Sequence, residues 1–233
     1  MKTLIIIPTY NERENLETAV TEIVSGQADG ADVLVVDDNS PDGTGALAED
    51  LVRSFPARVQ VLHRPAKLGL GSAYIDGFRY AVDRGYDLVC QMDADGSHDP
   101  HDVRRLVDAM DDHTDIVIGS RRVPGAAVLG WGPRRHFMSA AAMAAARLML
   151  GLSARDVTSG FRCYRGRAAA HLLRQPIVSR GFAFQEEVLL HCQKAGFRIK
   201  EIPVTFRNRQ MGKSKLGWRE VADFLLMVLR ARR

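Results

Sequence analysis

Two aspartates, Asp93 and Asp95, follow the apolar run Leu88–Met92 and form the sharpest chemical signal in the sequence. If that run is a strand, the alternation of side chains directs both carboxylates to the same side of its carboxyl end. Mg²⁺ in proteins typically binds one or two carboxylates together with phosphate oxygens of a substrate. The pair therefore predicts a site where Mg²⁺ or Mn²⁺ bridges a diphosphate. An acidic turn ahead of the helix that starts near Pro100 is the alternative without a metal.

A phosphohydrolase that uses Asp93 as nucleophile is a second alternative for the same pair. That class needs a lysine and a further acidic pair on later loops. Lys194 and Glu201 are too loosely placed to supply them, so the sequence favours the metal and diphosphate interpretation.

Further polar residues follow other apolar runs. Asp37 and Asp38 end the run Val33–Val36, where an acidic residue can accept hydrogen bonds from a ribose or a base. They can also begin the turn that leads to Pro41–Gly43. Lys67–Gly71 precedes a predicted helix, where its backbone N–H groups could cradle a phosphate. This segment matches neither the dinucleotide fingerprint nor the P-loop.

Cations take the corresponding places later in the chain. Arg121 follows the run Ile116–Ile118, where its charge could meet a phosphate. Arg134 and Arg135 open an apolar helix, and a helix N-terminus favours anions. The segment Arg207–Lys215 carries four cations in nine residues and could close over a diphosphate leaving group. Solvated surface charge is the alternative for each of these groups.

Strand and helix patterns alternate through the first half of the sequence, and these elements must position the residues above. Such an alternation is typical of an α/β domain with a mostly parallel sheet that is covered on both faces. Ligands of these sheets bind at the carboxyl ends of the strands. The predicted strands are Leu4–Ile7, Val33–Val36, Val59–Leu62, Leu88–Met92 and Ile116–Ile118, and the predicted helices cover residues 12–25, 44–54, 71–84 and 101–111.

The second half has longer loops and a different order of elements. The run Ile199–Phe206 predicts a strand, and Pro203 within it is typical of a sheet edge. The other predicted elements are a Gly/Pro-rich loop (122–134), an Ala/Met/Leu-rich helix (135–150), a further helix (185–195), a polar loop (207–217) and a C-terminal amphipathic helix (218–233).

The composition is that of a globular protein: 46% of the 233 residues are apolar and 26% are charged. Charge is uneven, because residues 1–120 carry a net −12 and residues 121–233 a net +16. The acidic half suits a metal, and the basic half suits phosphates, nucleic acid or an anionic membrane. The basic segment lacks the interleaved aromatic residues of a nucleic-acid binder. Three scattered cysteines predict no disulfide framework or zinc site, and hence a reduced, cytosolic compartment.

Eight sequence blocks, in this order, resemble the polyprenyl-phosphate (dolichyl-phosphate) mannosyltransferases of glycosyltransferase family 2. One block alone is weak evidence, but together they run from residue 4 to about residue 217. The chain departs from the family's pattern at Arg122, in the segment Val123–Ala127 and at Met143. The matching blocks are Ile7–Asn15, Val36–Thr44, Met92–Asp95 with Ser97 and His98, Gly119–Arg121, Thr158–Arg162, Phe184 and Gln185 with Glu187, Glu201–Pro203, and Arg209 with Gly212 and Ser214–Leu216.

The resemblance implies a nucleotide-sugar-binding fold of the GT-A type and an inverting transfer of mannose from GDP-mannose to a polyprenyl or dolichyl phosphate. The donor would be bound by Pro8, Tyr10, Glu12, Val36, Asp38, Asp93, Ala94, Asp95, Arg209 and Lys215. Mg²⁺ or Mn²⁺ would be held by Asp93, Asp95 and Ser97. The acceptor phosphate would be bound by Arg121, Arg135 and Ser139. The catalytic set would be Asp95, Arg121, Arg209 and Lys215.

The implied mechanism needs no protein base, because the nucleophile is already a phosphate anion. The metal, Arg209 and Lys215 would stabilise the departing diphosphate. Arg121 and Arg135 would align the attacking oxygen. Transfer of glucose from UDP-glucose, and a non-catalytic protein that binds a nucleotide sugar or an anionic lipid, are the alternatives.

The chain is expected to meet a membrane only at its surface. It has no run of about 18 uncharged apolar residues and no secretion signal. We expect a catalytic domain over residues 1–217, with an acceptor loop (122–134) and an interfacial helix (135–150), followed by the amphipathic helix 218–233. Helices of this kind lie on anionic membranes. The predicted location is the cytoplasmic face of a membrane, with a separate membrane-anchoring subunit left open and no nucleic-acid partner.

Overall fold

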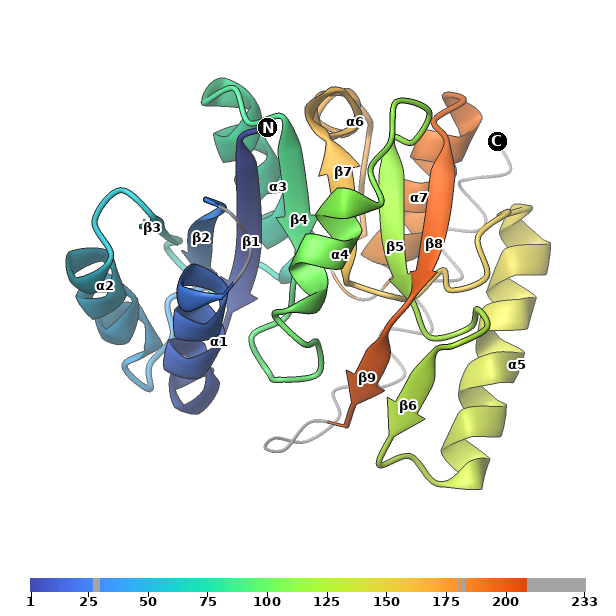
Figure 1. Cartoon of the computed structure of the whole chain (residues 1–233), viewed down its shortest axis with the longest axis horizontal. Helices are drawn as coiled ribbons and strands as arrows, with labels where there is room; N and C mark the ends of the chain where they lie inside the picture. Colours follow the sequence, from blue (N-terminus) through green and yellow to red (C-terminus); the bar gives the residue numbers. More distant parts are fainter. Residues whose placement is uncertain (27–29, 180, 182, 209–233) are drawn as a thin grey trace.

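Seven strands form one sheet in the computed structural model, which describes residues 1–26, 30–179, 181 and 183–208 (Figure 1). These strands are β1 (Thr3–Thr9), β2 (Asp32–Asp37), β3 (Val59–His63), β4 (Leu88–Gln91), β5 (Ile116–Ser120), β7 (Arg162–Arg165) and β8 (Ile199–Pro203). Their order across the sheet is β3-β2-β1-β4-β7-β5-β8. All neighbours are parallel except β7, which is antiparallel to both β4 and β5. The predicted mostly parallel sheet is confirmed.

Alternate side chains of the central strands enter two hydrophobic cores, one on each face of the sheet. In β1, Leu4 and Ile6 belong to one core, whereas Ile5 and Ile7 belong to the other. All four side chains are fully buried, which stabilises the fold by about 1.5 to 3 kcal/mol for each. A strand that is buried on both faces reads as a continuous apolar run, so the sequence predicts these strands well.

Helices cover both faces of the sheet. They are α1 (Arg13–Ser25), α2 (Thr44–Ser54), α3 (Leu70–Asp83), α4 (Asp102–Asp108), α5 (Pro133–Leu150), α6 (Gly166–Leu172) and α7 (Phe184–Lys194). The core with Ile5 is completed by α1, α2 and α4, and the core with Leu4 by α3, α5, α6 and α7. Figure 1 shows α1 and α4 in front of the sheet and α3 and α7 behind it. Every helix predicted within the described residues is present, and α6 is an addition.

The antiparallel strand β7 was not predicted. Its four residues, Arg162–Arg165, include an arginine at each end, so no apolar run marks the strand. Arg162 is completely buried, and its guanidinium group donates hydrogen bonds of 2.8 Å to the backbone oxygens of Val157 and Gln185. These bonds offset the loss of water around the charge. Because β7 runs antiparallel, the segment before it lies at the carboxyl ends of the parallel strands.

A second, two-stranded sheet occupies part of the predicted loop 122–134. It pairs β6 (Ala127–Leu129) with β9 (Thr205–Arg207) in parallel. The predicted strand Ile199–Phe206 is therefore divided. Its first part, β8, is an edge strand of the large sheet, as Pro203 predicts. Its second part, β9, leaves that sheet and pairs with β6.

Helix α5, at the right of Figure 1, buries only a few of its residues against the rest of the protein. Met143 and Ala146 are its buried residues, whereas Phe137, Met138 and Leu148 are 75%, 61% and 87% exposed. No helix in the described residues has the length and apolar content required to cross a bilayer. The predicted C-terminal helix, 218–233, lies outside the described residues.

Candidate active site

The carboxyl ends of the parallel strands meet at the lower edge of the sheet in Figure 1. Tyr10 follows β1, Asp38 follows β2, Asp93 follows β4 and Arg121 follows β5. Gly160 joins this edge because it precedes the antiparallel strand β7. Residues that the sequence places after separate strands are thus gathered on one side of the molecule, which we call the carboxyl edge.

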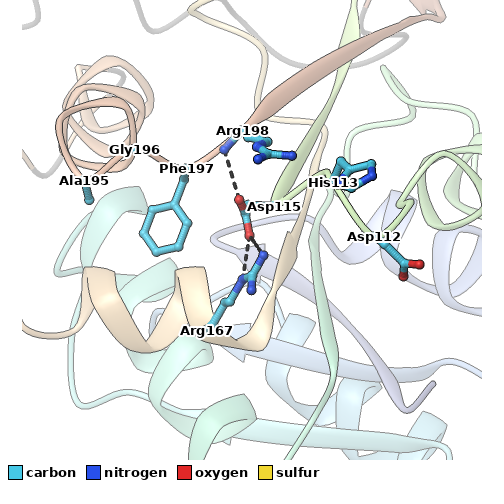
Figure 2. A pocket seen from close by; sticks show the side chains of 8 residues that line it. All are labelled: Asp112, His113, Asp115, Arg167, Ala195, Gly196, Phe197 and Arg198. Carbon is cyan, nitrogen blue, oxygen red and sulfur yellow. Dashed lines mark hydrogen bonds and ion pairs between the residues drawn. The ribbon is translucent and has the colours of Figure 1, made fainter.

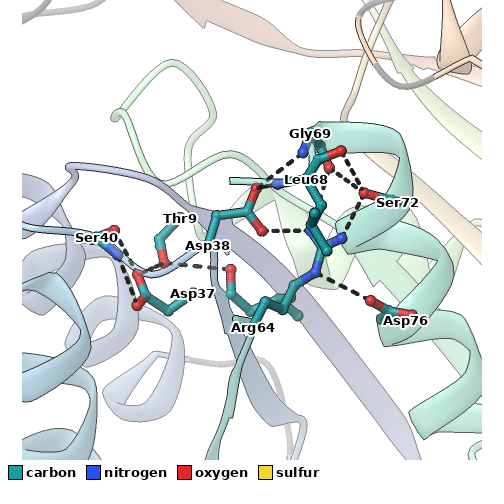
Figure 3. Close-up of polar contacts among 10 residues, drawn as sticks. Thr9, Asp37, Asp38, Ser40, Arg64, Leu68, Gly69, Ser72 and Asp76 are labelled. Atoms are coloured by element: carbon teal, nitrogen blue, oxygen red, sulfur yellow. Dashed lines mark hydrogen bonds and ion pairs between the residues drawn. The ribbon is translucent and has the colours of Figure 1, made fainter. Parts of the chain in front are cut away.

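The carboxylate of Asp38 is bonded to the loop that follows β3 (Figure 3). Its Oδ1 accepts a hydrogen bond from the Arg64 guanidinium group, and its Oδ2 accepts hydrogen bonds of 3.1 Å from the backbone N–H groups of Leu68 and Gly69. Arg64 also donates a 2.6 Å hydrogen bond to Ser72 Oγ. Asp38 therefore holds this loop at the carboxyl edge, a role that the sequence did not predict.

The same bonds correct the predicted phosphate cradle at Lys67–Gly71. Two of its backbone N–H groups point at the carboxylate of Asp38, so they do not face a ligand. Gly71 fits against Ser179 and the first residue of α7 because it has no side chain: a Cβ atom there would lie 2.5 Å from the backbone oxygen of Ser179 and 2.8 Å from the Phe184 ring. The glycines of this segment serve close packing and the path of the loop. The prediction of an anion cradle is wrong at Leu68 and Gly69.

Asp37, the other aspartate at the end of β2, is also held inside the protein. It is 2% exposed, and its Oδ1 accepts hydrogen bonds from Thr9 Oγ1 (3.2 Å) and Ser40 Oγ (2.6 Å). This network joins the ends of β1 and β2 (Figure 3). Asp37 is therefore the turn-forming member of the predicted pair.

The other residues of the predicted nucleoside site lie around the same two strand ends. Pro8 and Val36 are partners in the register between β1 and β2. The ammonium group of Lys67 lies 3.9 Å from the ring centre of Tyr10. Glu12 is the residue just before α1, and its Oε2 accepts a 3.0 Å hydrogen bond from Asn15. The structure thus brings this predicted set together at one end of the carboxyl edge.

Asp93 and Asp95 lie in the turn after β4. The strand ends at Gln91, so the alternation that was expected to direct both carboxylates to one side does not extend to them. Asp93 is half-buried and accepts a 3.3 Å hydrogen bond from Tyr74. Asp95 is 4% exposed, and its Oδ1 accepts a 3.0 Å hydrogen bond from the Ser97 backbone N–H. The turn geometry, rather than the strand, positions the two carboxylates.

Two buried rings support this turn. Burial, and then the adjacent Asp93, raise the pKa of Tyr74 well above its usual value, so its hydroxyl group remains a donor. Burial lowers the pKa of His98 despite the opposing effect of Asp93 and Asp95. The Nδ1 atom of His98 accepts a 3.3 Å hydrogen bond from the Asp93 backbone N–H. A neutral His98 therefore fixes the backbone where the first carboxylate begins.

The turn has the donor atoms that a hard divalent cation requires. Asp93 and Asp95 supply carboxylate oxygens, and Ser97 Oγ is buried with no hydrogen-bond partner among the described residues. Within the same residues, no three His, Cys, Asp or Glu side chains form a complete protein metal site. Mg²⁺ often takes one or two carboxylates and completes its shell with substrate phosphates and water. The residues fit Mg²⁺ or Mn²⁺ bound together with a phosphate ligand. Ala94, between the carboxylates, is buried in the core.

Arg121 is paired with a carboxylate that the sequence analysis missed. Its Nε and Nη2 atoms each donate a 2.8 Å hydrogen bond to Asp156, and Nη2 also donates a 2.6 Å bond to Thr158 Oγ1. Asp156 is fully buried. Burial would raise the pKa of Asp156, but the bonds and charge of Arg121 lower it below its usual value. Arg121 is therefore held in place by Asp156 and Thr158.

The other predicted phosphate ligands lie close by on α5. Ser139 Oγ accepts a 3.0 Å hydrogen bond from Arg122, one of the positions at which the chain departs from the family's pattern. Arg135 donates a 2.9 Å hydrogen bond to Asn208 Oδ1. Three arginines thus gather here, two after β5 and one in the first turn of α5. Such a cluster is suited to an anionic group.

Aromatic rings connect this arginine cluster to the carboxylate turn. The guanidinium groups of Arg121 and Arg135 lie 6.0 Å and 4.3 Å from the ring centre of Trp131. The Trp131 ring lies 5.7 Å from Phe206, and Phe206 lies 5.8 Å from His98. The run of rings therefore spans from the arginines to the residue beside Asp93. The remaining predicted cations, Arg209 and Lys215, lie outside the described residues.

A hollow of about 380 Å³ lies at the opposite end of the sheet (Figure 2). Asp115, which precedes β5, accepts hydrogen bonds there from Arg167 (2.6 Å) and from the backbone N–H of Arg198 (3.0 Å). No residue of the predicted site lines this hollow. It is shaped by a structural ion pair and does not belong to the carboxyl edge.

Residues 4–173 match the model of the family described as Glycosyl transferase family 2. The chain belongs to this family. A curated relative of this glycosyltransferase, named polyprenol monophosphomannose synthase, from Mycolicibacterium smegmatis, is 43% identical over 97% of this chain and 85% of the relative. A second, named undecaprenyl-phosphate mannosyltransferase, from Micrococcus luteus, is 44% identical over 99% of this chain and 93% of the relative.

Solved structures show that the fold of this family 2 glycosyltransferase is of the GT-A type, as predicted. A mannosyltransferase from Pyrobaculum calidifontis, in complex with GDP-Man and Mn²⁺, has a TM-score of 0.69 at 18% identity and covers 99% of this chain and 64% of its own. Glucosyl-3-phosphoglycerate synthase from Mycobacterium tuberculosis, in complex with Mn²⁺, UDP-glucose and phosphoglyceric acid, has a TM-score of 0.68 at 18% identity, with 99% and 79% coverage.

Several residues of the glycosyltransferase's carboxyl edge had no predicted role. Thr158, Gly160 and Gln185 lie in segments that resemble the family's motifs, but their positions in space could not be predicted. Asp156 and Trp131 lay outside those motifs. No local pattern marked Asp156, because buried and exposed residues alternate in the segment that contains it. No pattern marked Trp131, whose position depends on the unpredicted pairing of β6 with β9.

Proposed function

We propose that this glycosyltransferase moves mannose from GDP-mannose to a polyprenyl phosphate, giving polyprenyl-phosphate mannose and GDP. The identity of 43% and 44% over nearly the whole chain with two relatives named for such products carries the proposal. The carboxyl edge supports it, because a run of rings connects the two carboxylates after β4 to the arginines after β5 and in α5. UDP-glucose is the alternative donor, since a neighbour of the same fold was solved with it.

The proposed chemistry uses the acceptor's own charge. A phosphate oxygen of the lipid attacks the anomeric carbon of mannose, and the bond from that carbon to the GDP oxygen breaks with inversion. The nucleophile is already an anion, so no side chain has to remove a proton. Arg121, held by Asp156, and Arg135, stacked on Trp131, are placed to orient the attacking phosphate. Ser139 would join them through its hydroxyl group.

We propose that the donor binds along the remainder of the carboxyl edge. Pro8, Tyr10, Glu12 and Val36 would contact the guanosine, and Asp38 would act on it mainly by holding the neighbouring loop in place. Asp93, Asp95 and Ser97 would hold Mg²⁺ or Mn²⁺, which neutralises charge on the diphosphate when bound. Arg209 and Lys215, outside the described residues, would clamp the same diphosphate.

We also propose that the protein docks on the cytoplasmic surface of a membrane. Helix α5 supports this, because Phe137, Met138 and Leu148 are exposed on a helix with no acidic residue and with Arg134 and Arg135 in its first turn. Apolar groups beside cations favour an anionic bilayer surface. The proposed domain, residues 1–217, would act with helix 218–233 as a second contact.

The test of the reaction is transfer of radiolabelled sugar to a short polyprenyl phosphate in detergent. We expect product from GDP-mannose with Mg²⁺ or Mn²⁺, and loss of product when EDTA is added. Product from UDP-glucose alone would overturn the mannose assignment. Asp95→Asn should lower transfer by at least about 100-fold, since it removes charge at the diphosphate. Asp83→Asn, on an exposed position of α3, is the matched control.

The same purified chain tests the membrane proposal. We expect it to float with vesicles that contain anionic lipid, and replacement of Phe137 and Met138 by serine to reduce the bound fraction. Asp95→Asn should bind vesicles as wild type does. A pure lipid binder would show vesicle binding with no sugar transfer. Failure of the wild-type chain to bind vesicles would favour a separate anchoring subunit and would contradict docking through α5.

A further inference from the structure

Gln185, the second residue of α7, carries an amide group whose bonding is incomplete. The residue is 2% exposed, and neither its Oε1 nor its Nε2 has a hydrogen-bond partner among the described residues. A buried polar group without a partner destabilises the folded protein, so nearly all such groups in proteins are satisfied. An amide left unpaired at both atoms indicates a ligand that completes its bonding.

Gly160 shows what this amide faces. A Cβ atom built on Gly160 would lie 3.5 Å from Gln185 Nε2 and 3.7 Å from Asp93 Oδ2. The amide and the carboxylate therefore border the same small space, which is open because residue 160 has no side chain. Gln185 faces the carboxyl edge beside the proposed metal and diphosphate site.

The surroundings hold Gln185 in place. Its backbone oxygen accepts a 2.8 Å hydrogen bond from the buried Arg162. The preceding residue, Phe184, stacks on Tyr74 with ring centres 5.9 Å apart, and Tyr74 bonds to Asp93. The first turn of α7 and the carboxylate turn are thus fixed relative to each other. A polar group that is held this rigidly can bind a ligand without a large loss of side-chain entropy.

We propose that the Gln185 amide binds hydroxyl groups of the donor sugar. This rests on the proposed function, which places the donor diphosphate at Asp93 and so places the attached sugar beside it. The amide offers one donor atom and one acceptor atom on adjacent positions. Two neighbouring hydroxyl groups of a hexose present the complementary pair. Gln185 is thereby a sugar-binding residue of the donor site and does not contact the nucleoside.

The experiment compares two ligands that differ by the sugar alone. We would measure binding of GDP-mannose and of GDP by calorimetry with Mn²⁺, for wild type and Gln185→Met. Methionine keeps the length of the side chain and removes both polar atoms. We expect GDP-mannose to bind about 10- to 100-fold more weakly, because its hydroxyl groups would meet an apolar group. GDP should bind within about 2-fold of wild type, because it lacks the sugar.

Two further variants make the result specific. Gly160→Ala places a methyl group at ordinary contact distances from Gln185 and Asp93, so it should fold and weaken GDP-mannose more than GDP. Gln60→Met is the matched control, because the Gln60 amide oxygen is also buried without a partner among the described residues, but on β3. It should change neither affinity. Equal weakening of GDP and GDP-mannose by Gln185→Met, or no change in either, would overturn the proposal.

Deoxy-sugar analogues of the donor identify the hydroxyl group. Wild type should bind the analogue that lacks the contacted hydroxyl more weakly than GDP-mannose, whereas Gln185→Met should bind the two alike. If wild type binds UDP-glucose and not GDP-mannose, the proposed function fails but Gln185 is still tested, by comparing UDP-glucose with UDP. A loss confined to the sugar-bearing nucleotide would then support the role of Gln185.

Discussion

Glu186 is a buried carboxyl group that keeps its proton to a higher pH in the folded protein than in the unfolded chain. It is 6% exposed, and its Oε2 has no hydrogen-bond partner among the described residues. Burial raises its pKa from 4.5 to about 7, against smaller opposing effects that include the charge of Arg162. Replacement by glutamine removes the ionisable group and keeps the size of the side chain, so Glu186→Gln isolates the effect of ionisation on folding.

The sign follows from the two pKa values. Because the folded pKa is raised, the folded protein keeps a proton that the unfolded chain releases. The stabilisation from Glu186 is full below pH 4.5, falls as the pH rises and is lost above about pH 7. The difference between the pKa of Glu186 in the folded protein and in the unfolded chain corresponds to about 3 kcal/mol of free energy of unfolding. The free energy of unfolding of Glu186→Gln, relative to that of wild type, should therefore rise by about 2 to 3 kcal/mol between about pH 5 and pH 8.

Urea unfolding followed by circular dichroism measures this difference. The free energy of unfolding of wild type and Glu186→Gln would be compared at several pH values without metal. The amide group of the variant also changes the free energy of unfolding by an amount that does not depend on pH. This amount does not affect the test, because the prediction concerns only how the difference from wild type changes with pH. Glu17→Gln, at an exposed position of α1, is the control and should show no such trend. A difference between Glu186→Gln and wild type that does not vary with pH would refute the reasoning.

Three further perturbations test how the carboxyl edge is held together. Asp156→Ala removes the fully buried carboxylate that pairs with the mostly buried Arg121 guanidinium group, so urea unfolding should show a loss of about 3 to 5 kcal/mol, and a loss below about 1 kcal/mol would contradict the pairing. Gly71→Ala drives a methyl group against a backbone oxygen and should destabilise by about 1 to 3 kcal/mol in thermal unfolding. Gly132→Ala, with open space around it, is its control. Asp38→Ala removes the acceptor of two loop N–H groups, so hydrogen exchange at those amides should accelerate by at least about 10-fold, and unchanged exchange would contradict the anchoring role.

The sequence predicted the parallel strands because their burial on both faces leaves an apolar run in the chain. The helix over residues 44–54 was predicted with the observed boundaries, since its periodicity and the preceding turn agree. Strand β7 was not predicted because its end residues, Arg162 and Arg165, are charged. Their hydrogen bonds to distant carbonyl groups make the strand possible, and no local pattern records such bonds.

The candidate site, too, was predicted only where its signal is local in the sequence. Asp93 and Asp95 were recognisable because their chemistry and their position after a strand are both local features. The partners of Arg121 and Asp38 were not, since each depends on a segment far away in the sequence. Asp156 lies 35 residues beyond Arg121, and the Leu68 N–H lies 30 residues beyond Asp38. The fold, and not the local sequence, determines which charged side chains are already paired inside the protein.

The aromatic run from Trp131 through Phe206 to His98 packs the arginine cluster and the carboxylate turn against the same set of rings. The backbone N–H of Arg207 strengthens it with a 3.0 Å hydrogen bond to the Ser97 carbonyl group. For protein engineering, the exchangeable module is therefore not the acceptor loop by itself. A graft of another acceptor loop onto this scaffold has to carry β9 with it, because the strand connects the arginines proposed to bind the lipid phosphate to the carboxylates proposed to bind the nucleotide sugar.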